Sequence, residues 1–339
     1  MPNQRDVAKV AGVSSASVSR YLTNPDLVKP ATAERIQKAI NDLEYKLDYF
    51  ARSLKTGRSY HVGILLPGIG PFYWEIVQGI QDSLTRSGYF NTIFYTRDID
   101  TTIHSSREML SNFLNNNMIE GIIFFPLNTP GDMDILRDLK KVHEHIVIVD
   151  RDMDAPEFDQ VFIDNYQAGR LAAEAFLELG HRQFLFLHGM EVSYAAVMRR
   201  NGFYDRLEDD GITLDEDRII RGDYTSATAY RMTRERLPDM PPFTGVFAVS
   251  DSSAVGFLRA AMEHGLECPD DYSLIGFDNN EEFTPYTRPS LTTFQQPLNE
   301  MGRIAAERLI RQIDGQASSG RTILQTSFIH RESLADVPK

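Results

Sequence analysis

The first 45 residues show short apolar runs at helical spacing. Apolar positions between Val7 and Ala11 form one face of a first predicted helix. Gly12 permits a tight turn after it, and the Ser14 hydroxyl can cap the helix that follows. In that second helix Val18 and Leu22 are four residues apart, which places both against the first helix. The pattern predicts two short helices packed across a turn.

This arrangement is typical of a helix-turn-helix, whose second helix lies in the major groove of DNA. Arg20 can donate two hydrogen bonds to a guanine, and Ser15 offers a hydroxyl. The positions of this helix expected to face DNA are Ser15, Ala16, Ser17 and Arg20. The pattern therefore predicts a DNA-binding head.

From His61 onward, strand-sized apolar runs alternate with amphipathic segments. One predicted helix runs from about Phe72 to Arg86, with an apolar stripe at helical spacing. The predicted strands cover 61–67, 90–95, 119–125 and 146–150, and then a start near 161, 184–188, 245–249 and 273–277. Such alternation predicts an α/β fold with parallel sheets flanked by helices, and the two series of strands predict two lobes.

The charge of the chain divides between head and body. The net charge is −13, but residues 1–60 hold ten Lys or Arg against six Asp or Glu. The remaining residues hold 25 basic and 42 acidic side chains, a net charge of −17. Phosphate contact requires only a basic head, so DNA binding is expected there and not on the body.

The number of cysteines and the hydropathy of the chain indicate in which cellular compartment the protein is expected. Cys268 is the single cysteine, so no intramolecular disulfide is expected. Residues 1–10 lack the apolar run of a secretion signal, and no apolar stretch reaches the length of a membrane span. We expect a cytoplasmic protein without membrane attachment.

An ordered series of motifs along the chain resembles one protein family. The head contains Asp6-Val7-Ala8, then Ala11 to Ser14, then Val18 to Asn24, and further matches include Ile275 to Asn279 and Gln296-Pro297. In these motifs the chain is similar to the lactose-repressor/galactose-repressor (LacI/GalR) family of bacterial transcription regulators. The series extends over nearly the whole length.

The resemblance also covers the hinge that follows the head in this family. It matches residues 45–55, although Leu47-Asp48 replaces the usual Pro-Asn pair. Family members insert a hinge leucine into the minor groove, which unstacks a base step and bends the DNA. The residues that the resemblance places at this contact are Ala51, Arg52, Leu54 and Lys55.

The family fold implies a two-lobed body that resembles periplasmic sugar-binding proteins, with three chain crossings between the lobes. We expect those crossings near Phe162, Thr292 and Thr322. The expected domains are 1–46 for the helix-turn-helix, 47–60 for the hinge helix and linker, 61–162 with 292–321 for the N-terminal lobe, and 163–291 with 322–339 for the C-terminal lobe. A small-molecule effector would lie between the lobes, at the carboxyl ends of the strands.

Aromatic residues near strand ends suit stacking on a sugar or a planar base. By family position, Phe72 and Tyr73 are expected to contact the effector, and Tyr224 could supply a second aromatic wall. The neighbouring Trp74 is compatible with either the core or the cleft.

Polar residues near strand ends are also candidates for contact with the effector. Arg199 lies in a segment that in the family contacts effector hydroxyls or carboxylates, and Asp278 matches an effector-binding aspartate, with a helix cap as its alternative. Ser193 and Ala195 stand where purine-binding members carry arginine and threonine, which argues against a purine. Asp150 and Ser250, which follow predicted strands, are further candidates, and Ser193 is included among the effector-binding residues by its family position.

An enzyme is the first competing interpretation. Gly68-Ile69-Gly70 lacks the third glycine of a dinucleotide fingerprint, and neither a P-loop nor a G-x-S-x-G motif occurs. The histidines are scattered, so no zinc site is expected, and we expect no cofactor. A periplasmic binding protein would share the body but would not need the head.

The sequence thus favours a repressor of carbohydrate catabolic or transport genes. We expect a homodimer on a pseudo-palindromic double-stranded operator, switched by a small molecule that is a sugar or a sugar derivative. A regulator that responds to a nucleobase or another metabolite is the alternative, followed by a sugar-binding or sugar-processing protein.

Overall fold

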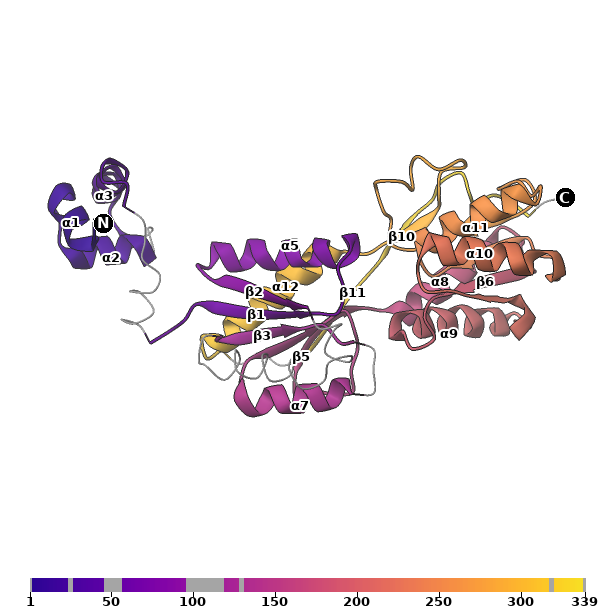
Figure 1. Ribbon diagram of the computed structural model, residues 1–339, viewed down its shortest axis with the longest axis horizontal. Helices are drawn as coiled ribbons and strands as arrows, with labels where there is room; N and C mark the ends of the chain where they lie inside the picture. The colour runs from indigo at the N-terminus through magenta and orange to yellow at the C-terminus, as the bar shows by residue number, and fades with distance from the viewer. Residues whose placement is uncertain are drawn as a thin grey trace. The chain divides into compact units, whose positions relative to one another are not determined.

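The computed structural model describes residues 2–23, 27–45, 57–95, 119–127, 131–316 and 320–337. The chain divides into two compact units, Met1–Ser59 and Tyr60–Lys339 (Figure 1). These are called the head and the body. The hinge residues 46–56 lie outside the described residues, so the expected division between 1–46 and 47–60 stays a prediction.

The head contains three helices, α1 (Gln4–Ala11), α2 (Ser15–Thr23) and α3 (Pro30–Asp42). The Asn3 side chain accepts from the backbone of Asp6 while the Asp6 carboxylate accepts from the backbone of Asn3, which is a capping box. Gly12 ends α1 at a φ of 63°, the left-handed conformation that glycine adopts without steric cost. Val7 and Val18 are fully buried in the head's small core. The predicted helix-turn-helix is confirmed.

The first lobe of the body, the N-lobe, is a six-stranded parallel sheet in the order β11-β5-β4-β3-β1-β2. Helices α5 and α12 pack together on one face, and α7 covers the other (Figure 1). The elements are β1 (His61–Leu66), α5 (Pro71–Arg86), β2 (Phe90–Tyr95), β3 (Gly121–Phe124), α7 (Asp132–Val142), β4 (Ile146–Val149), β5 (Asp159–Ile163), α12 (Leu298–Ile313) and β11 (Arg321–Leu324).

The second lobe, the C-lobe, is a four-stranded parallel sheet in the order β7-β6-β8-β9. Helices α8 and α9 cover one face, and α10 and α11 the other. The elements are α8 (Asn165–Glu178), β6 (Phe184–His188), α9 (Tyr194–Asp209), η3 (Glu216–Arg218), β7 (Ile219–Arg221), α10 (Ser226–Arg236), η4 (Leu237–Asp239), β8 (Gly245–Ala248), α11 (Asp251–Glu263) and β9 (Ser273–Ile275). The predicted α/β fold class is confirmed.

The strand pairing shows to which lobe the segments near the expected crossings belong. The last strand of the N-lobe before the first crossing is β5, which ends at Ile163. Directly after Thr292, β10 (Thr293–Gln295) pairs with β12 (Ser327–Ile329) and bridges to Asp278 in the C-lobe. Around Thr322, β11 lies in the N-lobe sheet and pairs with β5 through Leu324. The strands β10 and β11 are short and lack a long apolar run, so the hydropathy of the sequence does not mark where they end.

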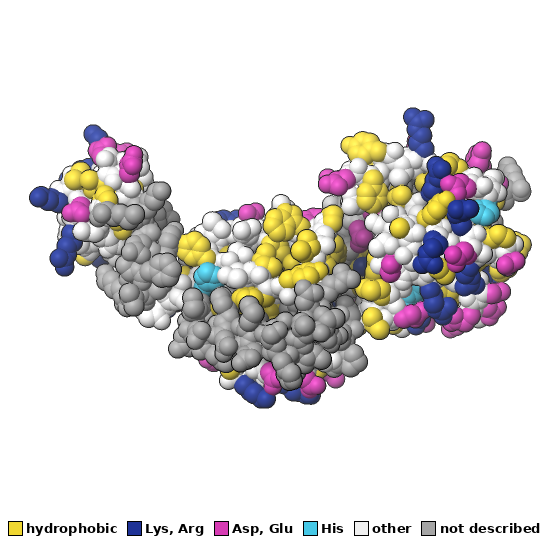
Figure 2. Space-filling view, in the orientation of Figure 1, with side chains coloured by type: hydrophobic (Ala, Val, Ile, Leu, Met, Phe, Trp, Pro, Cys, Tyr) yellow, Lys and Arg dark blue, Asp and Glu magenta, His cyan; other side chains and the backbone are white. Residues whose placement is uncertain are grey.

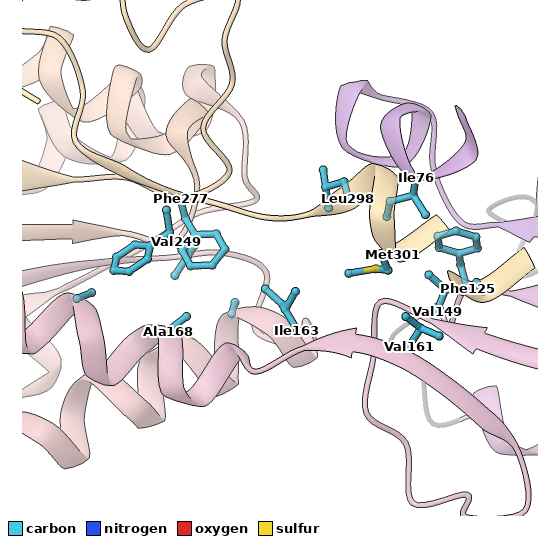
Figure 3. Packing of buried hydrophobic residues seen from close by; sticks show 14 of the residues in the cluster. Ile76, Phe125, Val149, Val161, Ile163, Ala168, Val249, Phe277, Leu298 and Met301 are labelled. Carbon is cyan, nitrogen blue, oxygen red and sulfur yellow. The ribbon is translucent and has the colours of Figure 1, made fainter. Parts of the chain in front are cut away.

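Buried side chains explain why each lobe is stable. In the central strands of each sheet, alternate apolar residues face the helices on the two sides and are buried by them. Figure 3 shows Ile76, Phe125 and Met301 packed in the N-lobe, with Val249 and Phe277 packed in the C-lobe. The carboxyl ends of the strands of both sheets carry the polar residues considered below.

The surface of the body is mixed in character. In the view of Figure 2 acidic and basic side chains alternate on the C-lobe, whereas hydrophobic side chains gather over the α5 side of the N-lobe. No helix in the described part of the chain is both long and apolar enough to cross a membrane.

Candidate DNA-binding and effector sites

The recognition helix α2 leaves most of its predicted contact positions open to solvent. Ser15, Ala16 and Arg20 are exposed, and Val18 packs into the head. Ser17 is half-buried, and its hydroxyl lies 2.9 Å from the Ser14 hydroxyl, which also accepts from the Ser17 backbone. Ser14 therefore caps α2 as expected, and Ser17 is already engaged in that cap.

The remaining predicted DNA contacts lie outside the described residues. They are Ala51, Arg52, Leu54 and Lys55 of the expected hinge helix. Their contact with the minor groove stays a prediction.

In the body, Arg199 of α9 is held by three partners. Its Nε donates to Asn165 Oδ1 at 2.9 Å, and its Nη1 donates to the Val249 carbonyl at 2.7 Å. The guanidinium also lies 3.5 Å from the centre of the Phe277 ring. Arg199 is only 4% exposed, so burial lowers its pKa, while the charges of Asp278 and Asp150 oppose this shift. The predicted effector residue is a buried cation at the junction of α8, β8 and β9.

Helix α9 can place Arg199 here because it packs against α8 at glycine contacts. A methyl group on Gly169 would lie 2.1 Å from the Arg199 carbonyl oxygen, and one on Gly202 would lie 1.9 Å from the Tyr166 carbonyl oxygen. Both distances are far below van der Waals contact. The two glycines therefore set the spacing of α8 and α9.

Two predicted carboxylates approach Arg199 from different lobes. Burial raises the pKa of Asp150 to about 7, against the charge of Arg199 and with the help of Asp278. Burial likewise raises the pKa of Asp278, and Arg199 and a hydrogen bond from Gln296 oppose that shift. Among the described residues no direct ion pair joins Arg199 to Asp150 or Asp278. The structure thus brings together Asp150 of the N-lobe with Arg199 and Asp278 of the C-lobe. These three residues are called the strand-end cluster.

The backbone is unusual at this cluster. Asp150 has a φ of 77°, Tyr224 of 69° and Asp278 of 116°. Residues other than glycine adopt such angles at a cost, and they do so most often at functional sites. Each of these residues lies within three residues of the end of a strand.

The sequence analysis did not identify Gln296 as a site residue. It is 2% exposed, its Nε2 donates to Asp278 Oδ1 at 2.7 Å, and its Oε1 has no hydrogen-bond partner. The available signal was its position directly after β10, at the second crossing between lobes.

Asp251 supports the loop that carries Asp278. Its carboxylate accepts from the Thr293 hydroxyl at 2.6 Å and from the Asn280 backbone at 2.8 Å. Burial raises its pKa, and the charge of Asp278 acts in the same direction. The helix cap beside it is Ser250, whose hydroxyl accepts from the Ser253 backbone. Ser250 thus has a structural bond, and its contact with an effector stays a prediction.

Ser193 and Tyr224 are paired with each other. The two hydroxyls form a hydrogen bond, and Ser193 also caps α9. A methyl group on Gly189 would lie 2.5 Å from the Tyr224 ring, so the glycine makes room for it. Tyr224 acts electrostatically on Arg199, and its role as an aromatic wall of the effector site stays a prediction.

Phe72 and Tyr73 lie at the start of α5 and are half-buried. Their rings meet edge to face at 5.1 Å, and Tyr73 also meets Phe125. These contacts tie them to the N-lobe core, and contact with an effector stays a prediction. Trp74 is 53% exposed and therefore lies outside the core.

The described residues contain no group of His, Cys, Asp and Glu placed to hold a metal ion.

These features define a class of protein: a helix-turn-helix head followed by a two-lobed body with a cluster of polar residues at its strand ends. The comparisons agree in both parts. Residues 4–48 match the model of bacterial regulatory proteins of the lacI family, and residues 173–334 match a periplasmic binding protein-like domain.

Related proteins cover the whole chain. The HTH-type transcriptional repressor CytR of Escherichia coli is 32% identical over 338 residues, which span 98% of this chain and 96% of CytR. The HTH-type transcriptional regulator MalR of Clostridium butyricum is 28% identical over 99% of this chain and all of MalR. The chain belongs to the LacI family, and the relatives named here are transcriptional regulators.

Solved structures show the same architecture. The complex of the transcriptional regulator CelR with cellobiose has a TM-score of 0.73 at 28% identity, covering 98% of this chain and all of that one. The Lac repressor dimer bound to operator and the anti-inducer ONPF has a TM-score of 0.78 at 24% identity, covering 98% and 99% of the two chains. This second likeness concerns the fold alone.

Proposed function

We propose that this protein is a sequence-specific transcriptional repressor of carbohydrate catabolic or transport genes, and that a small-molecule effector switches its operator affinity. The observation that carries the proposal is that one chain contains a helix-turn-helix head and a body in which both lobes contribute residues to the strand-end cluster. Such a protein acts in the cytoplasm, where the DNA is.

The head supports DNA binding by its exposed recognition surface. Arg20 and Ser15 are open to solvent on α2, while Val18 holds the helix in the head's core. A guanidinium on this helix can pair with the O6 and N7 atoms of guanine in the major groove.

The body supports an effector switch because the strand-end cluster spans both lobes. Asp150 belongs to the N-lobe, whereas Arg199 and Asp278 belong to the C-lobe. A ligand that binds all three favours the arrangement in which the lobes approach each other. It then shifts the population toward that state by its differential affinity.

A homodimer is part of the proposal. Trp74 on α5 and Ile93 and Tyr95 on the edge strand β2 expose 53%, 38% and 37% of their surface. Exposed apolar side chains that gather in a patch often mark an interface. A symmetric dimer would present two recognition helices to the two halves of a pseudo-palindromic operator.

The test selects duplexes from a random DNA pool with the purified protein and then measures affinity by fluorescence anisotropy. We expect enrichment of pseudo-palindromic sites. We also expect Arg20→Ala to lose about 1–3 kcal/mol of preference for one base pair in each half-site. Arg137→Ala is the matched control, because Arg137 is exposed on α7 of the body and pairs only with Asp134 among the described residues.

Selection that enriches no sequence would contradict the proposal. Equal DNA binding by the wild-type protein and Arg20→Ala would remove α2 as the recognition helix.

A further inference from the structure

The recognition helix α2 is held in the head at its first turn and at its middle. The Ser14 hydroxyl caps the first turn by accepting from the Ser17 backbone, and Gly12 makes the turn between α1 and α2. Val18, in the middle of the helix, is fully buried in the head's core. The last turn carries Arg20, the residue expected to contact a guanine. Its position depends on further contacts.

Tyr21 connects this last turn to α3. Its ring is half-buried against the head's core, and its hydroxyl donates to Gln37 Oε1 of α3 at 2.8 Å. Residues 20 and 21 follow each other on the helix, so their side chains point about 100° apart around its axis. Tyr21 can therefore face α3 while the Arg20 side chain remains exposed to solvent.

A second hydrogen bond orients the side chain of Gln37. Its Nε2 donates to Asn41 Oδ1, one turn further along α3, at 2.9 Å. Because one end of the amide donates to Asn41, the other end is the oxygen that Tyr21 requires as an acceptor. The three side chains form a continuous chain of hydrogen bonds from α2 to α3, in which each bond sets the direction of the next.

This chain of hydrogen bonds matters more for position than for stability. Gln37 and Asn41 are exposed, so water competes for the same groups and the net gain in stability is small. A binding group, however, must be held within about 0.5 Å of its productive position. Side chains reach about 5–6 Å from a helix axis, so a rotation of ~10° displaces their ends by about 1 Å. A small rotation of α2 therefore takes Arg20 out of hydrogen-bond distance of a base.

Contacts with phosphates and contacts with bases respond differently to such a displacement. The attraction between basic side chains and phosphates acts over a longer range and does not depend on sequence. Hydrogen bonds to the edges of bases require distances accurate to a few tenths of an ångström. A rotated recognition helix therefore loses specific affinity and keeps its affinity for unrelated DNA.

We propose that Tyr21 is a positioning residue for the recognition helix. Through Gln37 it fixes the last turn of α2 against α3, so that Arg20 meets its base at hydrogen-bond distance. Tyr21 itself contacts no base, and it acts on sequence-specific affinity alone. The inference rests on the proposed function, because it requires an operator that α2 reads.

The test uses the full-length protein and two duplexes of equal length. One is the operator selected with the wild-type protein, and the other is a scrambled duplex of the same base composition. Fluorescence anisotropy measures both affinities. We expect Tyr21→Phe, which removes only the hydroxyl, to bind the operator at least fivefold more weakly and to bind the scrambled duplex as tightly as wild type.

A double substitution shows whether Tyr21 acts through Gln37. Gln37→Ala is expected to cause a similar loss of operator affinity, and Tyr21→Phe in the Gln37→Ala protein is expected to cause no further loss. Tyr230→Phe is the matched control, because Tyr230 lies on α10 of the body and its hydroxyl donates to Glu263 at 2.7 Å. We expect it to leave both affinities unchanged. Circular dichroism confirms that the variants are folded.

Three outcomes would overturn the inference. They are an unchanged operator affinity in Tyr21→Phe, an equal loss on both duplexes, and losses that add in the double variant. An equal loss on both duplexes is the result expected of a direct phosphate contact or of an unfolded head. All three leave the proposed function standing, whereas a selection that enriches no sequence contradicts the proposed function and this inference together. The two failures are therefore distinguishable.

Discussion

The guanidinium of Arg199 lies 3.5 Å from the centre of the Phe277 ring, one residue before Asp278. This contact fixes the plane of the guanidinium, and hydrogen bonds to Asn165 and Val249 fix its rotation. Because Asn165 begins α8 and Val249 follows β8, the position of Arg199 depends on several elements of the C-lobe. A stacked, doubly bonded arginine is a rigid group, and rigid groups bind ligands with little loss of entropy.

Arg199→Lys is expected to weaken effector binding at least tenfold, about 1.4 kcal/mol. A lysine has one nitrogen and cannot hold both Asn165 and Val249 while it faces the carboxyls. The measurement is calorimetry with a small molecule that binds the wild-type protein. Arg200→Lys serves as the control, since Arg200 contacts only Asn201 among the described residues by hydrogen bonds. Unchanged affinity in Arg199→Lys would show that this arginine does not serve the site.

Asp150→Asn is expected to change how stability depends on pH. The pKa of Asp150 is about 7 in the folded protein and about 3.9 in an unfolded chain. Between these values the folded state holds a proton that the unfolded state has lost, so this group makes stability fall as pH rises from 4 to 7. Asparagine removes the effect. We expect Asp150→Asn to be more stable than wild type by about 1–2 kcal/mol at pH 8, with the difference vanishing near pH 4.

Urea unfolding at several pH values measures this difference. Asp154→Asn is the control, because Asp154 is an exposed carboxylate four residues further along. A variant that is less stable than wild type at pH 8 would show that the Asp150 charge stabilises the fold.

Gly202→Ala is expected to reduce the free energy of unfolding by about 1–3 kcal/mol, because the added methyl group forces α9 away from the Tyr166 carbonyl of α8. The same shift displaces Arg199, so the affinity for effector falls as well. Thermal unfolding and calorimetry provide the two readouts. Gly70→Ala is the control, since nothing lies within 4 Å of the position of its added methyl group. Equal effects of the two substitutions would contradict the close approach of the helices.

Leu54→Ala is expected to lower operator affinity and to leave effector affinity intact. The physical reason is the loss of the apolar wedge that unstacks a base step. Leu54 lies outside the described residues, so this prediction comes from the sequence alone. Anisotropy with the selected operator checks it, and the effector affinity of the same variant is the internal control. An operator affinity equal to that of wild type would exclude the wedge.

Much of the architecture was predictable from local pattern. The helix-turn-helix was determined by the sequence itself, because its signals act within a few residues. They are the turn at Gly12, the helix cap at Ser14 and the helical spacing of the buried Val18. The buried strands were also predictable, since an apolar run such as Ile146–Val149 must be covered on both faces. The short strands β10 and β11 carry no such run, and only their pairing partners define them.

The site was predictable in part. A carboxylate at a strand end, such as Asp150 or Asp278, is a visible signal because strand ends meet at one edge of a sheet. Three contacts of the site join residues that are 18 to 78 positions apart in the sequence. They are the hydrogen bond of Gln296 with Asp278, the hydrogen bond of Ser193 with Tyr224, and the stacking of Arg199 on Phe277. Hydrogen bonds of this kind depend on distances of a few tenths of an ångström, which only the packing of helices and sheets decides. The sequence determined which chemical groups are present, and the tertiary structure decided which of them remain open to a ligand.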